Sequence, residues 1–197
     1  MGEKRPITKE PSKVLRKKAA EVATSEIKNR AIQRLISDMK KTLKNTPDGV
    51  GLAAPQVGES LKIFIVSEEA KEIDKAEKEG WKRREHENPE IKNTKPYEAR
   101  DWKYYVFINP KEKNISKNKL DGPEGCLSVP GKFGTVKRHE KITVEAYDEH
   151  GKKFTRGASC FFARVMQHEL DHLIGTLFID KAKELFESVS HNKSGGG

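Results

Sequence analysis

The segment from Gln167 to His172 constrains this chain most, because it places two histidines four residues apart with a glutamate directly after the first. On a helix, residues four apart lie on one face, roughly 5–6 Å apart at their Cβ atoms. His168 and His172 can then bind one metal ion together, while Glu169 can reach a water molecule beside the ion. Apolar residues precede the motif at helical spacing and Gly175 can cap its end, so we expect a core-facing metal helix. The alternative is a helix with two surface histidines that match the motif by chance.

A third metal ligand must come from elsewhere, because a hydrolytic metal usually has three protein ligands and one open position. Phe178 stands where one class of metalloproteases has its third histidine, and phenylalanine cannot bind a metal. Glu184 and Glu187 lie in a lysine-rich segment, where solvated charges are expected. Cys126 has small and apolar neighbours that leave a thiolate accessible, although a lone cysteine is more often a small buried apolar side chain. Cys126 is the favoured third ligand.

A glycine-rich segment, Gly-Val-Gly-Leu-Ala-Ala-Pro-Gln, runs from Gly49 to Gln56. It lacks the Lys-Ser/Thr pair of a phosphate-binding loop, which makes nucleotide binding a weak interpretation. Together with Glu-Gly-Cys-Leu-Ser at 124–128 and Gln-His-Glu-Leu-Asp-His at 167–172, it resembles the three signature motifs of the peptide deformylase family. The motifs occur in the family's order, and the resemblance extends from about residue 7 to residue 180.

The resemblance implies a hydrolase that removes the N-formyl group from N-formylmethionyl nascent polypeptides and releases formate. Water activated by the metal would attack the formyl carbon, with Glu169 as general base and then general acid. Gln56 and the backbone N–H of Leu127 would stabilise the developing oxyanion, and Gly51 would pair with the substrate backbone. The implied metal ligands are Cys126, His168 and His172.

One divalent metal ion per chain is implied in the same way, with Fe²⁺ as the native ion. A thiolate with two imidazoles also suits Zn²⁺, Co²⁺ or Ni²⁺ as substitutes. Two alternatives remain. An endopeptidase of the His-Glu-x-x-His kind is disfavoured by Phe178 and by the Cys126 motif, and a basic module with a structural metal would need a fourth protein ligand.

Three residues of the metal helix are expected to line a pocket for the methionine side chain. Phe161, Arg164 and Val165 precede His168 by seven, four and three residues and therefore share its face. Val50 would close the opposite wall. The alkyl stem of Arg164 is expected to line the pocket while its guanidinium reaches solvent. The alternative is an ion pair between Arg164 and a carboxylate at the pocket rim.

At 197 residues the chain is long enough for a single domain, residues 1–197, with its own core. No apolar run approaches about 18 residues, so we expect no membrane span. The two cysteines, Cys126 and Cys160, indicate a reducing compartment rather than a disulfide scaffold. The net charge of +9 is interpreted as a lysine-rich solvated surface with no specific nucleic-acid partner, although transient proximity to the ribosome is an open alternative.

The hydrophobic pattern predicts an α+β fold in which antiparallel β-sheets pack around the central metal-binding helix. Strands are expected at 61–66, 104–108, 141–147 and 152–155, the second ending at Asn109. Ser25 is expected to cap a helix that ends near residues 45–49. The apolar stripe of that helix would consist of Ile27, Ala31, Leu35, Met39 and Leu43.

Residues 67–103 form a charged insertion relative to bacterial deformylases, in which 68–82 could be a surface helix, and residues 191–197 should be a disordered tail. Phe133 also departs from the bacterial pattern, which often has a polar or basic residue there. This departure bears on how the outer residues of the substrate are recognised. Enrichment in lysine and asparagine suggests a eukaryotic organelle enzyme, of a plastid, apicoplast or mitochondrion, and otherwise a cytoplasmic one. The chain shows no transit peptide.

Overall fold

The computed structural model describes residues 2–46, 49–73 and 103–187, and the structural statements below concern these ranges. The expected tail at 191–197 lies outside them, as does most of the expected insertion. Residues 69–73 are helical, and the rest of the helix expected at 68–82 lies outside the described residues. Among the described helices, none has the length and apolar character needed to cross a membrane.

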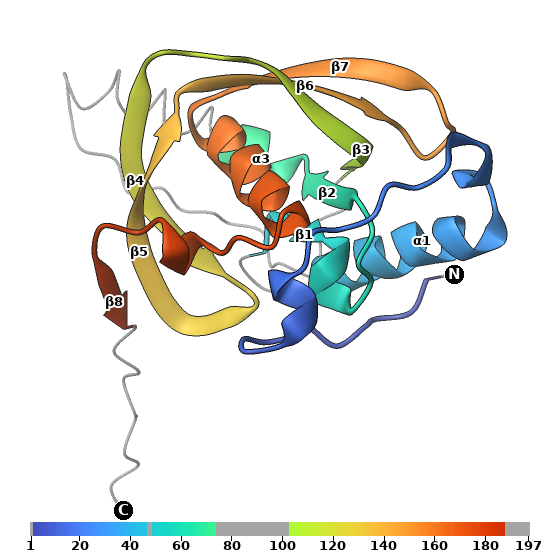
Figure 1. The fold of residues 1–197 in the computed structure, drawn as a ribbon, viewed down its shortest axis with the longest axis horizontal. Coiled ribbons are helices and arrows are strands. Elements are labelled where there is room, and N and C mark those ends of the chain that lie inside the picture. Colours follow the sequence, from blue (N-terminus) through green and yellow to red (C-terminus); the bar gives the residue numbers. More distant parts are fainter. Residues whose placement is uncertain (1, 47–48, 74–102, 188–197) are drawn as a thin grey trace, which may run out of the picture.

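Two antiparallel sheets form the framework (Figure 1). The five-stranded sheet has the order β1-β2-β3-β6-β7, and the three-stranded sheet has the order β4-β5-β8. The strands of the first are β1 (Gly51–Ala53), β2 (Ile63–Ser67), β3 (Tyr104–Ile115), β6 (Lys141–Tyr147) and β7 (Lys153–Ser159). Those of the second are β4 (Lys119–Cys126), β5 (Val129–His139) and β8 (Leu185–Glu187).

Helix α3 (Cys160–Leu173) lies in the middle of the molecule, between the two sheets (Figure 1). Its Phe162, Ala163 and Met166 belong to the same buried cluster as Phe64 of β2 and Phe107 of β3. This arrangement confirms the predicted α+β fold with antiparallel sheets around a central helix.

The helix also ends where the sequence predicts. Gly175 has a φ of +77°, the left-handed conformation in which glycine carries no steric penalty. A Cβ there would lie 2.6 Å from the carbonyl oxygen of Arg16, so the glycine also permits a close approach of the N-terminal segment. The Ala19 N–H also donates to the Leu173 carbonyl at 2.9 Å, which ties the C-terminal end of the metal helix to this segment.

Helix α1 (Arg30–Lys44) begins later than expected, and the assignment of Ser25 as its cap is wrong. Ser25 lies in a short 3-10 turn, η2 (Thr24–Glu26). The helix is capped by Asn29, whose side-chain oxygen accepts hydrogen bonds from two backbone N–H groups of the first turn at 2.9 and 3.1 Å. Ala31 is exposed, and Ile27 is buried ahead of the helix. The buried stripe of α1 instead consists of Ile32, Leu35, Ile36, Met39 and Leu43.

The expected end of the 104–108 strand at Asn109 is also wrong, since the observed strand, β3, continues to Ile115 through a bulge after Ile108. Asn109 has a φ of +49°, which asparagine tolerates better than most residues. Its side chain exchanges hydrogen bonds of 2.9 and 2.7 Å with the backbone N–H and carbonyl of Val22. The bulge thus turns a predicted strand end into an anchor for the N-terminal segment.

Three further 3-10 helices complete the described chain: η1 (Lys13–Arg16), η3 (Ala54–Val57) and η5 (Phe178–Asp180). Helix η3 follows β1 directly, and it carries Gln56.

Candidate metal centre and active site

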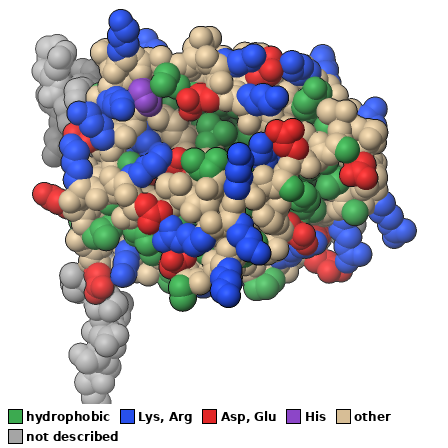
Figure 2. Space-filling model, in the orientation of Figure 1, with side chains coloured by type: hydrophobic (Ala, Val, Ile, Leu, Met, Phe, Trp, Pro, Cys, Tyr) green, Lys and Arg blue, Asp and Glu red, His purple; other side chains and the backbone are tan. Residues whose placement is uncertain are grey.

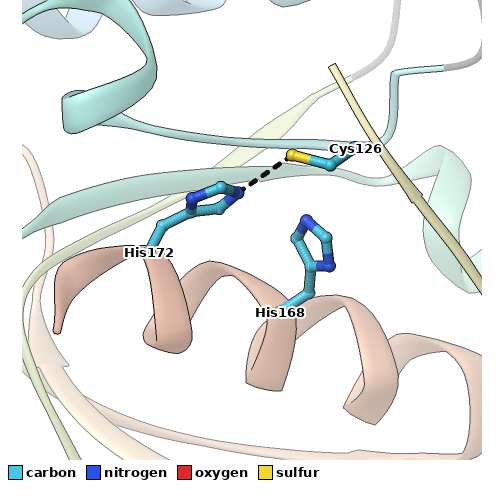
Figure 3. Close-up of side chains that lie close together, drawn as sticks. All are labelled: Cys126, His168 and His172. Carbon is cyan, nitrogen blue, oxygen red and sulfur yellow. Dashed lines mark hydrogen bonds between the residues drawn. The ribbon is translucent and has the colours of Figure 1, made fainter. Parts of the chain in front are cut away.

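The structure brings the three expected donors together. His168 and His172 lie one turn apart on α3, with ring centroids 5.0 Å apart, and Cys126 at the end of β4 faces them (Figure 3). The Cys126 Sγ lies 3.3 Å from the His172 Nε2, and the donor atoms of all three residues lie within 4.8 Å of one another. Thiolate and imidazole donors on one tetrahedral ion are about 3.5 Å apart. The donor set therefore fits a single metal ion.

The sulfur of Cys126 is surrounded by hydrogen-bond donors. The strand pairing is irregular between Gly125 and Cys126, which ends β4 and turns the chain back into β5. The backbone N–H of Ser128 lies 3.4 Å from the sulfur and the Gln56 Nε2 lies 3.5 Å from it. Two N–H donors from separate segments therefore point at the sulfur.

Glu124 orients the first histidine. Its Oε2 lies 3.0 Å from the His168 Nδ1, so a proton on Nδ1 leaves Nε2 free for the metal. Arg138 donates to both oxygens of the same carboxylate, at 2.8 and 2.9 Å. Burial would raise the pKa of Glu124, but the hydrogen bonds from Arg138 and His168 lower this pKa to about 2. Glu124 therefore stays ionised beside the metal centre.

Arg138 extends this network to the metal helix, because its Nη1 donates to Asp171 of α3. Asp171 also accepts from Lys181, at 2.6 Å. The buried chain of Glu124, Arg138 and Asp171 thus ties β4, β5 and α3 to one another. Sequence reasoning missed it, although Glu124 and Asp171 both lie inside the signature motifs.

Arg164 belongs to the same network, and the expectation that its guanidinium reaches solvent is wrong. The residue is only 9% exposed. Its Nη1 donates to Glu124 at 3.0 Å and to the Val136 carbonyl at 2.8 Å, and its Nη2 donates to the Leu120 carbonyl at 2.9 Å. Gly122 makes this possible, because a Cβ there would lie 2.6 Å from Nη2. The alternative of a carboxylate partner is correct, but the pair is buried and not at the rim.

Glu169 lies beside the donors with its carboxylate buried. It is 3% exposed, and its Oε2 has no hydrogen-bond partner among the described residues. A Cβ at Gly51 would lie 2.4 Å from Oε1, so β1 approaches this carboxylate at a position that only glycine can occupy. Burial raises the pKa of Glu169 to about 7. A carboxylate with such a pKa can both accept and return a proton near neutral pH.

Gln56 is fixed so that its amide nitrogen faces the cysteine. Its Oε1 accepts from the Ala53 N–H at 2.8 Å, which directs Nε2 toward Cys126 and the Ser128 hydroxyl. The N-terminal segment 8–10 holds this loop and the cysteine loop together. The Thr8 N–H donates to the Gln56 carbonyl, Lys9 to the Leu127 carbonyl and the Glu10 N–H to the Ser128 carbonyl. No motif in residues 8–10 signals this bracing role.

A cavity of about 320 Å³ opens beside the donors. All five residues expected to bind substrate line it, namely Val50, Gly51, Phe161, Arg164 and Val165, and so do Gln56, Leu127 and Glu169. Lys132 and Phe133 of β5 also line it. Glu184 and Glu187, the alternative ligands, are exposed and do not belong to the donor cluster.

A Cys/His/His donor set next to a buried carboxylate, at the edge of a cavity, is the kind of site that metal-dependent hydrolases use. The chain belongs to the polypeptide deformylase family, whose family model matches residues 4–187. Peptide deformylase of Symbiobacterium thermophilum is 40% identical over 91% of this chain and 67% of its own length. Peptide deformylase 1A, chloroplastic, of Solanum lycopersicum is 37% identical over 94% of this chain. This chain spans only 62% of the length of that plant relative.

Solved structures agree with this assignment. The Met-Ala-Ser-bound class I type b peptide deformylase of Acinetobacter baumannii matches with a TM-score of 0.71 and 30% identity, over 92% of this chain and 99% of that one. Peptide deformylase of Legionella pneumophila matches with a TM-score of 0.68 and 34% identity, over 90% of this chain and 85% of that one.

Proposed function

We propose that this chain is a metal-dependent hydrolase that removes the N-formyl group from N-formylmethionyl peptides and releases formate. The observation that carries the proposal is the convergence of Cys126, His168 and His172 beside the buried carboxylate of Glu169, in a chain of the deformylase family. Met-Ala-Ser, the peptide bound to the Acinetobacter baumannii relative, has the sequence that deformylation of formyl-Met-Ala-Ser leaves.

In this proposal each residue beside the donors has one task. A divalent ion held by the three donors would supply Lewis-acid chemistry, polarising the formyl oxygen and lowering the pKa of water. Glu169 would accept the proton of the attacking water and pass it to the leaving amine as the C–N bond breaks. Gln56 Nε2 and the Leu127 N–H would donate to the oxygen on which charge develops. One such donor is typically worth about 2.7–4 kcal/mol of barrier.

The substrate backbone would pair with β1. This strand is the first in the order of its sheet, so among the described residues only one of its edges is paired, by β2. An extended peptide could add to the other edge at Gly51, with main-chain hydrogen bonds. The methionine side chain would then enter the cavity between Val50, Phe161 and Val165, where an unbranched thioether adapts well to the apolar walls.

The decisive experiment measures the free amino termini released from formyl-Met-Ala-Ser, acetyl-Met-Ala-Ser and casein, with formate as a second readout for the formyl peptide, alongside metal analysis. We expect new amino termini from the formyl peptide only, with formate in equal amount and about one metal ion per chain. Glu169→Gln is the control variant, since it removes the base and leaves the three donors in place. Digestion of casein would favour the endopeptidase alternative. A metal-loaded chain that releases no formate would refute the proposal.

We propose Fe²⁺ as the native ion, with Zn²⁺, Co²⁺ or Ni²⁺ as substitutes. The mixed thiolate and imidazole donor set supports this range of metals. Anaerobic purification followed by metal analysis tests it. Activity that is lost in air and restored by Ni²⁺ or Co²⁺ is the expected result, whereas full activity with zinc and no gain from iron would contradict it.

An organelle location is proposed if the source is a eukaryote, and a cytoplasmic one otherwise. The plant relatives carry chloroplastic names, and other relatives are bacterial. Proximity to the ribosome would be transient and not sequence-specific, since lysine and arginine are spread over the face in Figure 2 without one dominant patch. Cosedimentation with ribosomes that persists at high salt would contradict this view.

A further inference from the structure

An aromatic row extends from the metal centre across the three-stranded sheet. Gly125 of β4 pairs with Phe133 of β5, and Phe133 pairs with Phe186 of β8. Directly paired residues of antiparallel strands present their side chains on the same face. The three residues therefore form one row that begins next to Cys126 and ends at β8, which lies beside the β4–β5 hairpin in Figure 1.

The two rings of this row form a continuous apolar surface. Gly125 leaves room for the first ring, since a Cβ there would lie 2.8 Å from the Phe133 Cε1. The ring of Phe186 stacks beside it, with centroids 6.4 Å apart and planes 12° apart. Phe133 is 41% exposed and Phe186 is 47% exposed. Phe133 lines the cavity and Phe186 extends its ring surface across the sheet, so the pair offers an exposed apolar contact next to the site.

The row is continuous with the cavity that would take the methionine side chain. Phe133 lines this cavity, as does Gly51. A peptide paired with β1 would leave the cavity in extended form, rising about 3.3–3.4 Å per residue with side chains on alternate sides. The residue after methionine would point away from the methionine pocket. The third residue would point to the same side as methionine, about 7 Å further out.

We propose that Phe133 and Phe186 form a subsite for an apolar side chain, preferably aromatic, at the third residue of the substrate. This inference rests on the proposed deformylase function and specifies which formylated peptides the site prefers. An aromatic or large aliphatic side chain would cover both exposed rings, whereas serine or a charged residue would leave them in water.

The experiment compares kcat/KM for formyl-Met-Ala-Phe, formyl-Met-Ala-Ser and formyl-Met-Phe-Ser, with formate release as the readout. For the wild-type chain we expect phenylalanine at the third residue to raise kcat/KM over serine about tenfold, the order expected for partial burial of an aromatic side chain. The same phenylalanine at the second residue should give less than about half of that gain, since its side chain points away from the row.

Two variants and one control assign the preference to the row. Phe133→Ser should reduce the ratio between formyl-Met-Ala-Phe and formyl-Met-Ala-Ser to below about twofold, and Phe186→Ser should give an intermediate ratio. Leu185→Ser is the matched control. It changes an exposed apolar residue of the same strand that pairs with Gly134 and therefore points to the other face. Its ratio should equal that of the wild type.

Three results would overturn the inference: a wild-type ratio near one, a ratio that Phe133→Ser leaves unchanged, or an equal gain from phenylalanine at the second residue. Each presupposes turnover, so each leaves the deformylase proposal standing. Absence of formate from every peptide would refute the function itself. If Phe133→Ser does not fold, the wild-type ratio and Phe186→Ser still decide the question.

Discussion

Replacing Arg164 with leucine distinguishes between two arrangements of this side chain, a buried guanidinium and one that reaches solvent. The observed side chain donates to Glu124 and to three backbone carbonyls, those of Leu120, Gly122 and Val136. Each lost hydrogen bond to a neutral acceptor costs about 0.5–1.5 kcal/mol, and one to a charged group about 1.5–3 kcal/mol. Leucine recovers part of this loss by burying apolar surface, and Glu124 keeps Arg138. We therefore expect Arg164→Leu to lower the free energy of unfolding by about 2–4 kcal/mol.

Equilibrium unfolding in urea measures this loss, with equal metal occupancy in both proteins. For a chain of this length the same loss corresponds to a fall in Tm of roughly 5–15 °C. Arg34→Leu is the control, because Arg34 is exposed and pairs with Glu3 at 3.3 Å on the surface. It should cost less than about 1 kcal/mol. Arg164→Lys should recover only part of the loss, since an ammonium cannot reach acceptors on two strands at once.

A loss below about 0.5 kcal/mol for Arg164→Leu would refute this reasoning, because a solvent-exposed guanidinium over an apolar stem predicts such a small effect. A loss as large in Arg34→Leu would show that leucine at any arginine site is harmful. Only a large difference between the two variants supports the buried network.

Three further substitutions test single groups. Glu169→Gln should reduce formate release by about 10²–10⁴-fold with the metal content unchanged, and loss of the metal would assign Glu169 a different role. Cys126→Ser should lower metal affinity in a chelator competition, because a hydroxyl is a poor replacement for a thiolate; unchanged affinity would place the third ligand elsewhere. Asp38 accepts hydrogen bonds from the Glu3 N–H and from Arg5, at 2.8 and 2.9 Å. Burial alone would raise the pKa of Asp38, but these two hydrogen bonds lower it below its ordinary value. Asp38→Asn should thus be less stable than the wild type at neutral pH, and this difference should disappear only as acid titrates Asp38 below its ordinary pKa; a difference that persists in strong acid would contradict the assignment.

The donor set was predictable because its geometry is mostly local. A helix fixes the direction of His168 and His172 from their spacing alone, and Gly175 marks where that helix ends. The same rule placed Phe161 and Val165 along the cavity. Cys126 was inferred from its motif, since the β4–β5 turn that aims it at α3 is a tertiary feature. Its role as a ligand remains a prediction.

Two errors concern where elements begin and end. Ser25 and Asn29 are both good caps, but Ser25 lies inside the 3-10 turn η2 and Asn29 caps α1. Asn109 next to proline is a normal strand end, yet contacts with the N-terminal segment carry β3 through it. At Asn109 the local signal is outweighed by Val22, a partner distant in sequence.

Arg164 shows why such partners escape a sequence pattern. Its position on α3 fixes the direction of the alkyl stem. That direction does not determine whether the guanidinium at its end is surrounded by water or by protein. Four acceptors on β4 and β5 decide that question, and they come within reach only because Gly122 has no side chain to keep the guanidinium away. With those acceptors in place, a buried arginine is less costly than an empty space above an ionised Glu124. The Arg164 guanidinium, which the sequence pattern places in solvent, thus holds together β4, which carries Cys126, and β5, which forms a wall of the cavity.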